Sequence, residues 1–374
     1  ITINEQAIAG RLRFTPASQP ASFEINKIEI SEHTLPWLED KNDLTETNKR
    51  LFGLPPYAQD HKNLFSMVNY ASLYLPILNI LRPECICEIG SDAGDNTKLL
   101  AEYCAQNGAQ LLIVDPVKPA LDFLDSANHV RFSLMKSTDF LRNNHSPANV
   151  FFIDGDHNYQ TVSQELQLID NMKQQTDVPF CLFVHDISWP CAYRDMYYDP
   201  DELGVAQSCY CRGKGISPYS ECPVDDSQLP ASHAFATTEG GPANGVKKAI
   251  EDFLAQRDTE WRNIDIASLY GFGVLWTSDR LSPEQYEVFD KLEKHFSYFR
   301  DFLAILEWNR MVLYYQIFRN SEIWEKQQDH IKKQQDHIKK LEHWIDRGVK
   351  ERISDFIKAK TFKNNIDITQ RNRQ

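Results

Sequence analysis

Between residues 64 and 280, short apolar runs alternate with segments whose apolar residues recur at helical spacing. The apolar runs have the length of strands and fall near residues 85–90, 110–115, 129–135, 149–154 and 180–186. Helical spacing marks residues 64–81, 95–106, 118–125, 138–143 and 159–173. This alternation predicts an α/β fold with a parallel, doubly wound sheet.

The alternation stops over residues 188–238, which are rich in Pro, Gly, Tyr, Asp and Cys. A loop of this length inside a compact domain is usually a lid or a binding loop, so we expect an insert here. A run of glycines at residues 240–245 then precedes a predicted helix over 246–256.

Two further strands are predicted near residues 262–268 and 272–277. Tyr270 and Gly271 form a natural tight turn between them, so the pair can be antiparallel. We therefore expect one domain over residues 61–280, with five parallel strands closed by an antiparallel hairpin.

The segments that flank this domain have different patterns. Residues 1–60 contain scattered prolines and predict an irregular segment. The first residue is Ile1 rather than Met, so we leave open whether the native N-terminus is present. Residues 281–320 are helical and aromatic, and we expect them to pack on the domain or on a second subunit.

Residues 321–348 contain a duplication in which Lys-Gln-Gln-Asp-His-Ile-Lys occurs twice in succession, over 326–332 and 333–339. A period of seven residues is typical of a coiled coil, so we predict a homo-oligomer through the C-terminal helices. The core positions a and d are then occupied by Trp324, Gln327, Ile331, Gln334, Ile338, Leu341 and Ile345. Glutamine at d weakens such a coil, and a solvated single helix is the alternative.

Composition and charge exclude some classes of protein. The formal net charge is -13, which argues against nucleic-acid binding. Residues 347–374 differ, with eight Lys or Arg and three Asp or Glu. Their interspersed apolar residues predict a basic amphipathic tail over 349–374 that contacts an anionic membrane, although a solvated basic end also fits. Cysteines within apolar strands indicate buried thiols in a reducing cytoplasm.

The end of the first predicted strand carries a candidate nucleoside site. Glu88 is followed by Gly90, Ser91 and Gly94, and then by a helix start. The two glycines let the backbone turn tightly under a ligand, and the amides of the next helix point there. Asp115 ends the next strand, where an acid can bind both hydroxyls of a ribose. The spacing is not Gly-x-Gly-x-x-Gly, so a dinucleotide is less favoured.

The ends of the fourth and fifth predicted strands carry a second candidate site. Asp154, Asp156 and His157 follow one strand, and His185 and Asp186 end the next. Carboxyl ends of parallel strands face the same crevice, so Asp154 and Asp186 can approach one another and bind a cation such as Mg²⁺. His157 can act as a general base for a hydroxyl. Helix capping by Asp154 and Asp156 is the simpler alternative, but it leaves His157 and Asp186 unexplained.

The first motif, Glu-x-Gly-x-x-x-Gly with a strand-end Asp, resembles motif I and the ribose acid of class I S-adenosylmethionine (SAM) methyltransferases. This resemblance implies a Rossmann-like seven-stranded sheet, parallel with an antiparallel last strand, and SAM as the cofactor. The residues that it assigns to SAM are Glu88, Gly90, Ser91, Gly94, Asp115 and Asp154.

The second motif, Asp-x-x-His with an acid on the next strand, resembles the Mg²⁺-dependent macrolide-sugar O-methyltransferases. The resemblance implies that Asp154 and Asp186 bind the metal and that His157 is the base. That family has two acids at the fifth strand, whereas here the first is His185. His185 is therefore either a metal ligand or a hydrogen-bonding neighbour of the ligands.

Residues 185–190, 194–198 and 239–246 resemble bacterial methyltransferases of glycan biosynthesis. This implies a saccharide acceptor, and the residues assigned to it are Asp156, Trp189, Arg194, Asp195 and Tyr198. Arg194 and Asp195 could instead anchor the loop. A head joined to a coil and a basic tail also resembles chain-terminating enzymes of O-antigen synthesis, which implies a cytoplasmic protein peripheral to the inner face of the membrane.

Three alternatives stay open at this point. The acceptor could be a small phenolic or macrolide product, and the chain could be a non-catalytic scaffold that assembles through the coil. In the insert, Cys209, Cys211, Cys222 and His233 could bind Zn²⁺, but their spacing favours free thiols.

Overall fold

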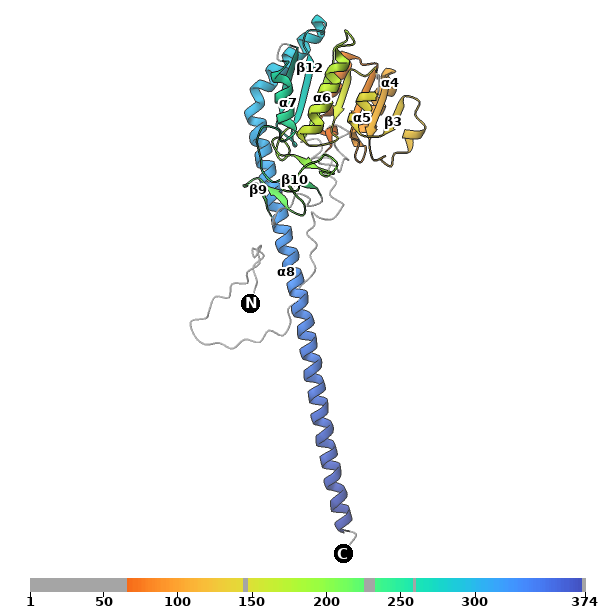
Figure 1. Ribbon diagram of the computed structural model, residues 1–374. Helices are drawn as coiled ribbons and strands as arrows, with labels where there is room; N and C mark the ends of the chain where they lie inside the picture. Colours follow the sequence, from red (N-terminus) through yellow and green to blue (C-terminus); the bar gives the residue numbers. More distant parts are fainter. Residues whose placement is uncertain (1–65, 144–146, 225–232, 258–259, 372–374) are drawn as a thin grey trace. The chain divides into compact units, whose positions relative to one another are not determined.

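The computed structural model describes residues 66–143, 147–224, 233–257 and 260–371 (Figure 1). Within the last helix, α8, side chains are described as far as Ile317 and for part of residues 326–340. The predicted N-terminal segment 1–60 and the start of the helix predicted over 64–81 lie outside the described residues.

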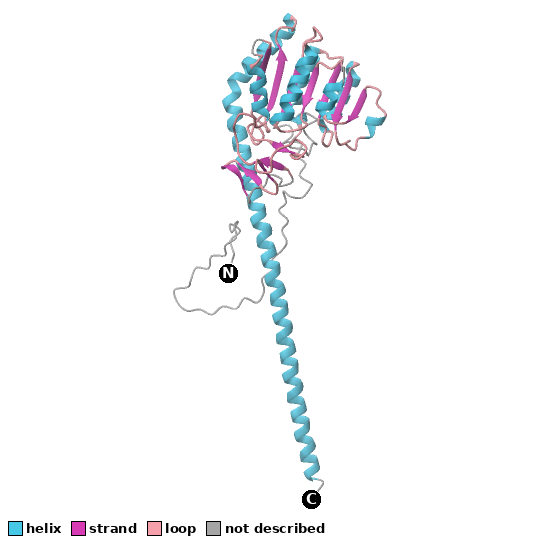
Figure 2. Cartoon of the chain, viewed as in Figure 1, coloured by secondary structure: helices cyan, strands magenta, loops and turns pink. Residues whose placement is uncertain are grey.

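A single sheet of seven strands forms the centre of the domain, in the order β11-β12-β5-β4-β1-β2-β3 (Figure 2). Strands β1 to β5 are parallel, and β12 is antiparallel to both β5 and β11. The strands are β1 (Cys85–Ile89), β2 (Gln110–Asp115), β3 (Val130–Leu134), β4 (Val150–Ile153), β5 (Cys181–His185), β11 (Trp261–Ile266) and β12 (Phe272–Thr277). The predicted Rossmann-like sheet with an antiparallel closing strand is confirmed.

The helices follow the strands as predicted, with one exception. They are α3 (Ala71–Leu81, after the 3₁₀ turn η1, Met67–Tyr70), α4 (Asp95–Asn107), α5 (Ser137–Asn143), α6 (Tyr159–Lys173) and α7 (Val246–Ala255). The helix predicted over 118–125 is wrong, because only a 3₁₀ turn, η2 (Asp122–Asp125), forms there. Pro119 lacks a backbone amide and disfavours helical backbone at the preceding residue, which explains the late start.

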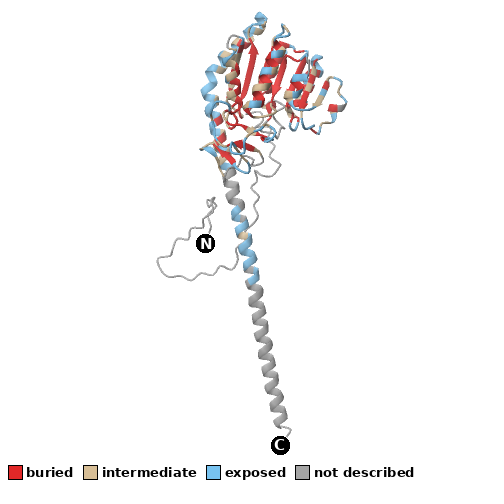
Figure 3. Cartoon of the chain, viewed as in Figure 1, coloured by how far each residue is buried: buried red, intermediate tan, exposed pale blue. Residues whose placement is uncertain are grey.

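Both faces of the sheet are covered, as Figure 3 shows by the buried strands between the helices. On one face, Phe151 and Ile153 of β4 belong to a core that includes residues of α6 and α7. On the other face, Phe152 packs edge-on against Tyr74 of α3, with ring centroids 4.9 Å apart. Burial on both faces explains why the strand sequences are continuously apolar rather than alternating.

The insert contains more regular structure than its sequence predicts. It forms a three-stranded sheet and a two-stranded sheet. Their strands are β6 (Met196–Tyr197), β7 (Tyr210–Cys211), β8 (Gly215–Ser217), β9 (Ser220–Val224) and β10 (Ala234–Ala236). Four of these strands have only two or three residues, too short to show a hydrophobic period, and β9 (Ser220–Val224) is mostly polar, so the sequence indicates only a loop.

A single helix, α8 (Pro283–Arg371), follows the sheet and is 89 residues long. Gly348 does not interrupt it, and the segment boundaries predicted at residues 320 and 348 are not helix ends. Near its start, Phe289 stacks on Trp276 of β12 with centroids 4.8 Å apart. The side chains of residues 341–371 are not described, so membrane contact by the tail stays a prediction. Among the described residues, no helix combines the length and apolar content needed to cross a membrane.

Candidate active site

The carboxyl ends of β4 and β5 bring two acids and two imidazoles together. The strands are paired in parallel, with Ile153 beside Val184, so Asp154 and Asp186 leave the sheet at the same edge. Asp186 has a φ of 59°, which is uncommon for a residue other than glycine. Such backbone conformations concentrate at functional sites, and here it follows directly on the last residue of β5.

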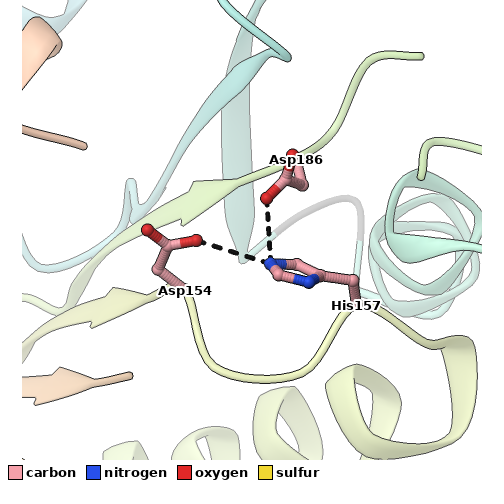
Figure 4. Close-up of side chains that lie close together, drawn as sticks. All are labelled: Asp154, His157 and Asp186. Carbon is pink, nitrogen blue, oxygen red and sulfur yellow. Dashed lines mark ion pairs between the residues drawn. The ribbon is translucent and has the colours of Figure 1, made fainter. Parts of the chain in front are cut away.

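The four side chains form a closed cluster. His157 Nε2 lies 2.9 Å from Asp186 Oδ2 and 3.6 Å from Asp154 Oδ1 (Figure 4). On the other side, His185 Nδ1 lies 3.2 Å from an oxygen of each of the same two carboxylates. Potential ligand atoms of Asp154, His157 and Asp186 all lie within 4.8 Å of one another, close enough to bind one metal ion.

The charges in this cluster are strongly coupled. Burial lowers the pKa of His157, but the carboxylates of Asp186 and Asp154 outweigh burial and raise it well above its ordinary value. The same opposition, with Asp154 acting first, raises the pKa of His185 to about 10. Burial alone would raise the pKa of Asp186, yet the two imidazoles hold it below its usual range. The protein thus places two negative charges where only imidazolium groups or a bound cation can compensate them.

The glycine loop after β1 lies directly against this cluster. Gly90 and Gly94 have φ values of 84° and 81°, in the left-handed region that glycine adopts readily. A Cβ at Gly90 would collide with the backbone of Asp154 and Gly155. A small pocket is lined by residues of this loop together with Asp154. The two sites predicted separately from the sequence are therefore adjacent.

Glu88 lies beneath the loop and is 2% exposed. Its carboxylate accepts hydrogen bonds from Asn96 Nδ2 at 2.8 Å and from Thr97 Oγ1 at 2.6 Å, both in the first turn of α4. Burial raises the pKa of Glu88 to about 7. In this position Glu88 joins the loop to α4, and it borders the pocket predicted for the cofactor.

Asp115 ends β2 beside the same loop. Its Oδ2 accepts hydrogen bonds from the backbone N–H of Ser91 at 2.7 Å and from Ser91 Oγ at 2.9 Å. Its Oδ1 accepts from the N–H of Val117 at 2.7 Å. The carboxylate is partly exposed, and Oδ1, which accepts one hydrogen bond, can accept another from a ribose hydroxyl, whereas Oδ2 already accepts two.

Asp156 and Asn158 shape the start of α6. The side chain of Asn158 accepts a hydrogen bond from the N–H of Thr161 at 2.8 Å and is the N-cap. Asp156 accepts from Thr161 Oγ1 at 3.0 Å. The cap predicted for Asp154 or Asp156 is therefore Asn158, and Asp156 only supports the start of the helix through the Thr161 hydroxyl.

Arg194 and Asp195 are buried anchors of the insert. The guanidinium of Arg194 is 1% exposed and donates to the carbonyl oxygens of Ala236 and Glu221 at 2.8 and 2.7 Å. Asp195 Oδ1 accepts from the N–H groups of Tyr159 and Gly245 at 2.7 and 2.6 Å. These contacts favour the anchoring interpretation over direct substrate binding.

Tyr198 and Trp189 take different positions in the insert. The ring of Tyr198 is 55% exposed, 6.1 Å from the ring of His157. Trp189 packs against the buried Ile216 and Phe235 of the insert. Of the two, Tyr198 is the better placed to meet an acceptor beside His157.

Two residues near the cluster have no role in this site predicted from the sequence. The ring of His233 lies 5.1 Å from that of Tyr198. Tyr70 lies 6.0 Å from the ring of His185 and donates from its hydroxyl to the carbonyl of Ser268. Tyr70 belongs to an apolar helix start and His233 to an irregular stretch, so neither has a local signal of function.

The zinc alternative finds no support among the described residues. Their one group of three or more potential ligands close enough for a metal ion is Asp154, His157 and Asp186. Cys209, Cys211 and Cys222 are free thiols.

Comparison with known families matches part of the chain. Residues 87–187 match a family model described as a methyltransferase domain. The match spans β1 to β5 and therefore contains the glycine loop, Asp115 and the acid–imidazole cluster. No curated protein matches the chain.

Solved structures are similar at low identity. A methyltransferase from Podospora anserina, PaMTH1, bound to SAH, is 11% identical, covers 62% of this chain and 95% of its own, and has a TM-score of 0.37. An O-methyltransferase from Bacillus cereus in complex with SAH is 13% identical over 62% and 87% of the two chains, with a TM-score of 0.33. TomG from Streptomyces achromogenes, an O-methyltransferase in complex with SAM, is 16% identical over 61% and 85%, with a TM-score of 0.33.

Proposed function

We propose that the protein transfers the methyl group of SAM to a hydroxyl oxygen of a saccharide, with a divalent cation in the site. The observation that carries this proposal is the contact between the Gly90 loop and the Asp154–His157–Asp186 cluster. A nucleoside site and an acid–base site at one sheet edge are what a methyl transfer to oxygen requires. The methyltransferase-domain match over residues 87–187 supports the same chemistry.

The residues present fit SAM. The pocket beside Gly90, Ser91 and Gly94 has Asp115 next to it, hydrogen-bonded to Ser91. A side chain at Gly90 would displace this loop from the end of β4. Bound SAM would supply an electrophilic methyl group. Ser91 and Asp115 would orient the nucleoside, so that most of the rate gain comes from alignment of the acceptor oxygen with the methyl carbon.

The cluster also fits a divalent cation. Asp154 and Asp186 provide the carboxylate oxygens that Mg²⁺ prefers, and the neighbouring imidazoles would also suit Mn²⁺ or another transition metal. A cation there would neutralise the two carboxylates and lower the pKa of an acceptor hydroxyl. His185 touches both acids, and we propose that it holds their orientation or serves as a further ligand.

His157 is the proposed base. Its Nε2 faces Asp186 and Asp154, whereas its buried Nδ1 has no hydrogen-bond partner among the described residues. An imidazole held through one nitrogen by a carboxylate presents the other as a proton acceptor. Without a cation the two carboxylates raise the pKa of His157 and keep its ring protonated. A cation that neutralised Asp154 and Asp186 would remove this effect, and His157 would then accept the proton of the acceptor hydroxyl at Nδ1 while Asp186 keeps the ring in that orientation.

The proposed class of acceptor is inferred from the residues at the edge of the site. Tyr198 exposes an aromatic ring near His157, and an aromatic face can pack on the apolar face of a sugar ring. We propose a saccharide of a surface polysaccharide, methylated in the cytoplasm. A phenolic or macrolide acceptor would use the same residues, and a non-catalytic scaffold would retain the fold without binding SAM.

The test separates binding from chemistry. Calorimetry measures SAM binding to the full chain, and mass spectrometry follows label from SAM into candidate glycans, phenols and macrolides. We expect SAM binding and a mass gain of one methyl group on a glycan. SAM binding with methyl transfer only to a phenol would show that the acceptor is a phenol and not a saccharide. Absence of SAM binding would overturn the proposal and support the scaffold.

A further inference from the structure

Helix α8 has two apolar faces, and only one of them contacts the domain. On the packed face, Phe289 and Met311 are buried. Glu307 on the same face accepts hydrogen bonds from the backbone N–H groups of Leu269 and Tyr270 at 2.7 and 2.9 Å. These contacts hold α8 against the turn between β11 and β12.

The other face presents large apolar side chains to solvent. Each is between 45% and 84% exposed, and we call them the α8 stripe: Tyr298, Phe299, Phe302, Ile305, Leu306, Leu313 and Ile317. With 3.6 residues per turn, the stripe lies on the side of the helix opposite Glu307 and Met311. A contiguous exposed apolar face of this kind marks an interaction surface.

The stripe is in register with the duplicated heptads further along the same helix. Counting back in sevens from Gln327 at position d reaches Leu313, Leu306 and Phe299. Counting back from Trp324 at position a reaches Ile317. One heptad frame therefore begins at Phe299, before the predicted coil over 321–348, with apolar residues at d from Phe299 to Leu313 and at a from Ile317 onward. At the preceding a position, Arg310 pairs with Glu307 of the packed face.

Charge in the duplicated segment is confined to the outer positions of this frame. Every Lys and Asp between residues 326 and 340 falls at b, c or f: Lys326, Asp329, Lys332, Lys333, Asp336, Lys339 and Lys340. Positions a, d, e and g carry no Lys or Asp there. Two copies could therefore pair face to face without opposing like charges.

The stripe and the heptads together supply the area of a stable pair. Five stripe residues fall at positions a, d and g of the frame, and half of roughly 200 Å² for each is about 500 Å² per copy. The heptads add the rest of one partner's share of a standard interface. A second copy of the chain explains both the area and the shared frame, because a parallel pairing lays each stripe and each heptad on itself.

We propose that the α8 stripe is a self-association surface, on which a second copy of this chain binds in parallel and in register from Phe299 onward. The duplicated heptads extend this interface and do not create it. The proposal is independent of the methyl transfer, because the stripe lies outside the catalytic cluster.

The first experiment compares two triple variants of the full chain by analytical ultracentrifugation. Phe299→Ser/Leu306→Ser/Leu313→Ser should raise the dissociation constant of the oligomer about 100-fold or more, since central apolar residues dominate interfaces. The matched control, Lys294→Ser/Asp301→Ser/Lys333→Ser, changes exposed residues off the stripe and should leave the constant unchanged. Circular dichroism checks that both variants retain the fold. A stripe variant that is folded and associates like the wild type would overturn the proposal, as would a monomeric wild type.

The second experiment tests orientation. In a Cys209→Ser/Cys222→Ser background, Ile317→Cys should form a disulfide between copies on mild oxidation, because position a meets itself in a parallel pair. Lys333→Cys, at an outer position, should not. Cross-linking at both positions alike, or at neither, would contradict the parallel register.

Discussion

In most proteins charged side chains face water and apolar side chains are buried, and the sheet edge and helix α8 depart from this pattern in opposite ways. At the sheet edge, charged side chains are largely shielded from water: His185 is 3% exposed, and Asp154, His157 and Asp186 are half-buried. On α8, aromatic and aliphatic side chains face water, and Tyr298 is 84% exposed. Buried charge and exposed apolar surface are the two informative departures from an ordinary globular protein.

The difference shows what each region lacks. A half-buried pair of carboxylates needs positive charge, which protonated imidazoles or a bound cation can provide. An exposed apolar stripe needs a surface to cover it, which a second α8 can provide. The first region is therefore expected to respond to metal, base and cofactor, and the second to protein concentration.

Removing divalent cations should have the largest effect on the sheet edge. Enzyme treated with EDTA should lose turnover to background, and Mg²⁺ or Mn²⁺ should restore it, because without a cation the acceptor hydroxyl is not activated and the two carboxylates keep His157 protonated. Steady-state rates before and after metal addition measure this. Full turnover in EDTA would show that the two imidazoles alone compensate the acids.

Replacing the base should be nearly as severe. His157→Ala should lower turnover by ~10²–10⁴, the usual contribution of a general base. SAM affinity, measured by calorimetry, should stay unchanged. His129→Ala is the control, since its ring contacts the carbonyl of Ala101 away from the cluster. A near-normal rate at pH 7 would show that His157 is not the base and that His185 or water accepts the proton.

Glu165 is a buried acid outside the cluster, so it shows what a buried carboxyl costs in stability when it has no proposed role in catalysis. It is fully buried on α6, and burial raises its pKa to about 8. A raised folded-state pKa means that the stabilising proton is present at low pH and is lost as the pH rises through the folded value. The wild type should therefore lose stability between pH 5 and pH 9, and Glu165→Gln should not. Compared with the wild type, the variant's free energy of unfolding should be higher at pH 9 than at pH 5 by on the order of 3–5 kcal/mol.

Denaturant titrations at the two pH values check this prediction. Glu284→Gln, an exposed substitution at the start of α8, is the control and should show no such pH dependence. If Glu165→Gln gains no stability at high pH, the carboxylate is solvated or paired when it ionises.

The ribose acid should give a smaller, binding-only effect. Asp115→Ala removes the charge-assisted hydrogen bond that Oδ1 can accept from the proposed ribose, worth roughly 1.5–3 kcal/mol. It also frees the amide of Ser91, so the loop is less ordered. Calorimetry should show weaker SAM binding, whereas Asp301→Ala on α8 should bind normally. Unchanged affinity in Asp115→Ala would rule out the ribose role.

The sequence predicts the sheet well because each strand is a short, buried apolar run that stops at a polar turn. Asp154, His157 and Asp186 could be placed together for the same reason, since parallel strands end at one edge. For Arg194 and Asp195 the sequence left anchoring and substrate binding as alternatives, because the partners of Asp195, Tyr159 and Gly245, are distant in sequence. The sequence does not predict that α8 continues through residue 348, because a glycine such as Gly348 weakens a helix but does not always end it.

Truncation at Asn320 should have the smallest effect on catalysis and separates the two regions directly. The sheet ends with β12 at Thr277, and the contacts of Glu307 lie before the cut, so SAM affinity should be unchanged.

The α8 stripe ends at Ile317, so the truncated chain should associate more weakly than the full chain but still self-associate at high concentration. Adding Phe299→Ser to the truncated chain should then produce a monomer. Light scattering over a range of concentrations compares all three proteins. Equal masses for the full and truncated chains would mean that the heptads act as a spacer or a solvated helix, and that any oligomer forms before residue 320.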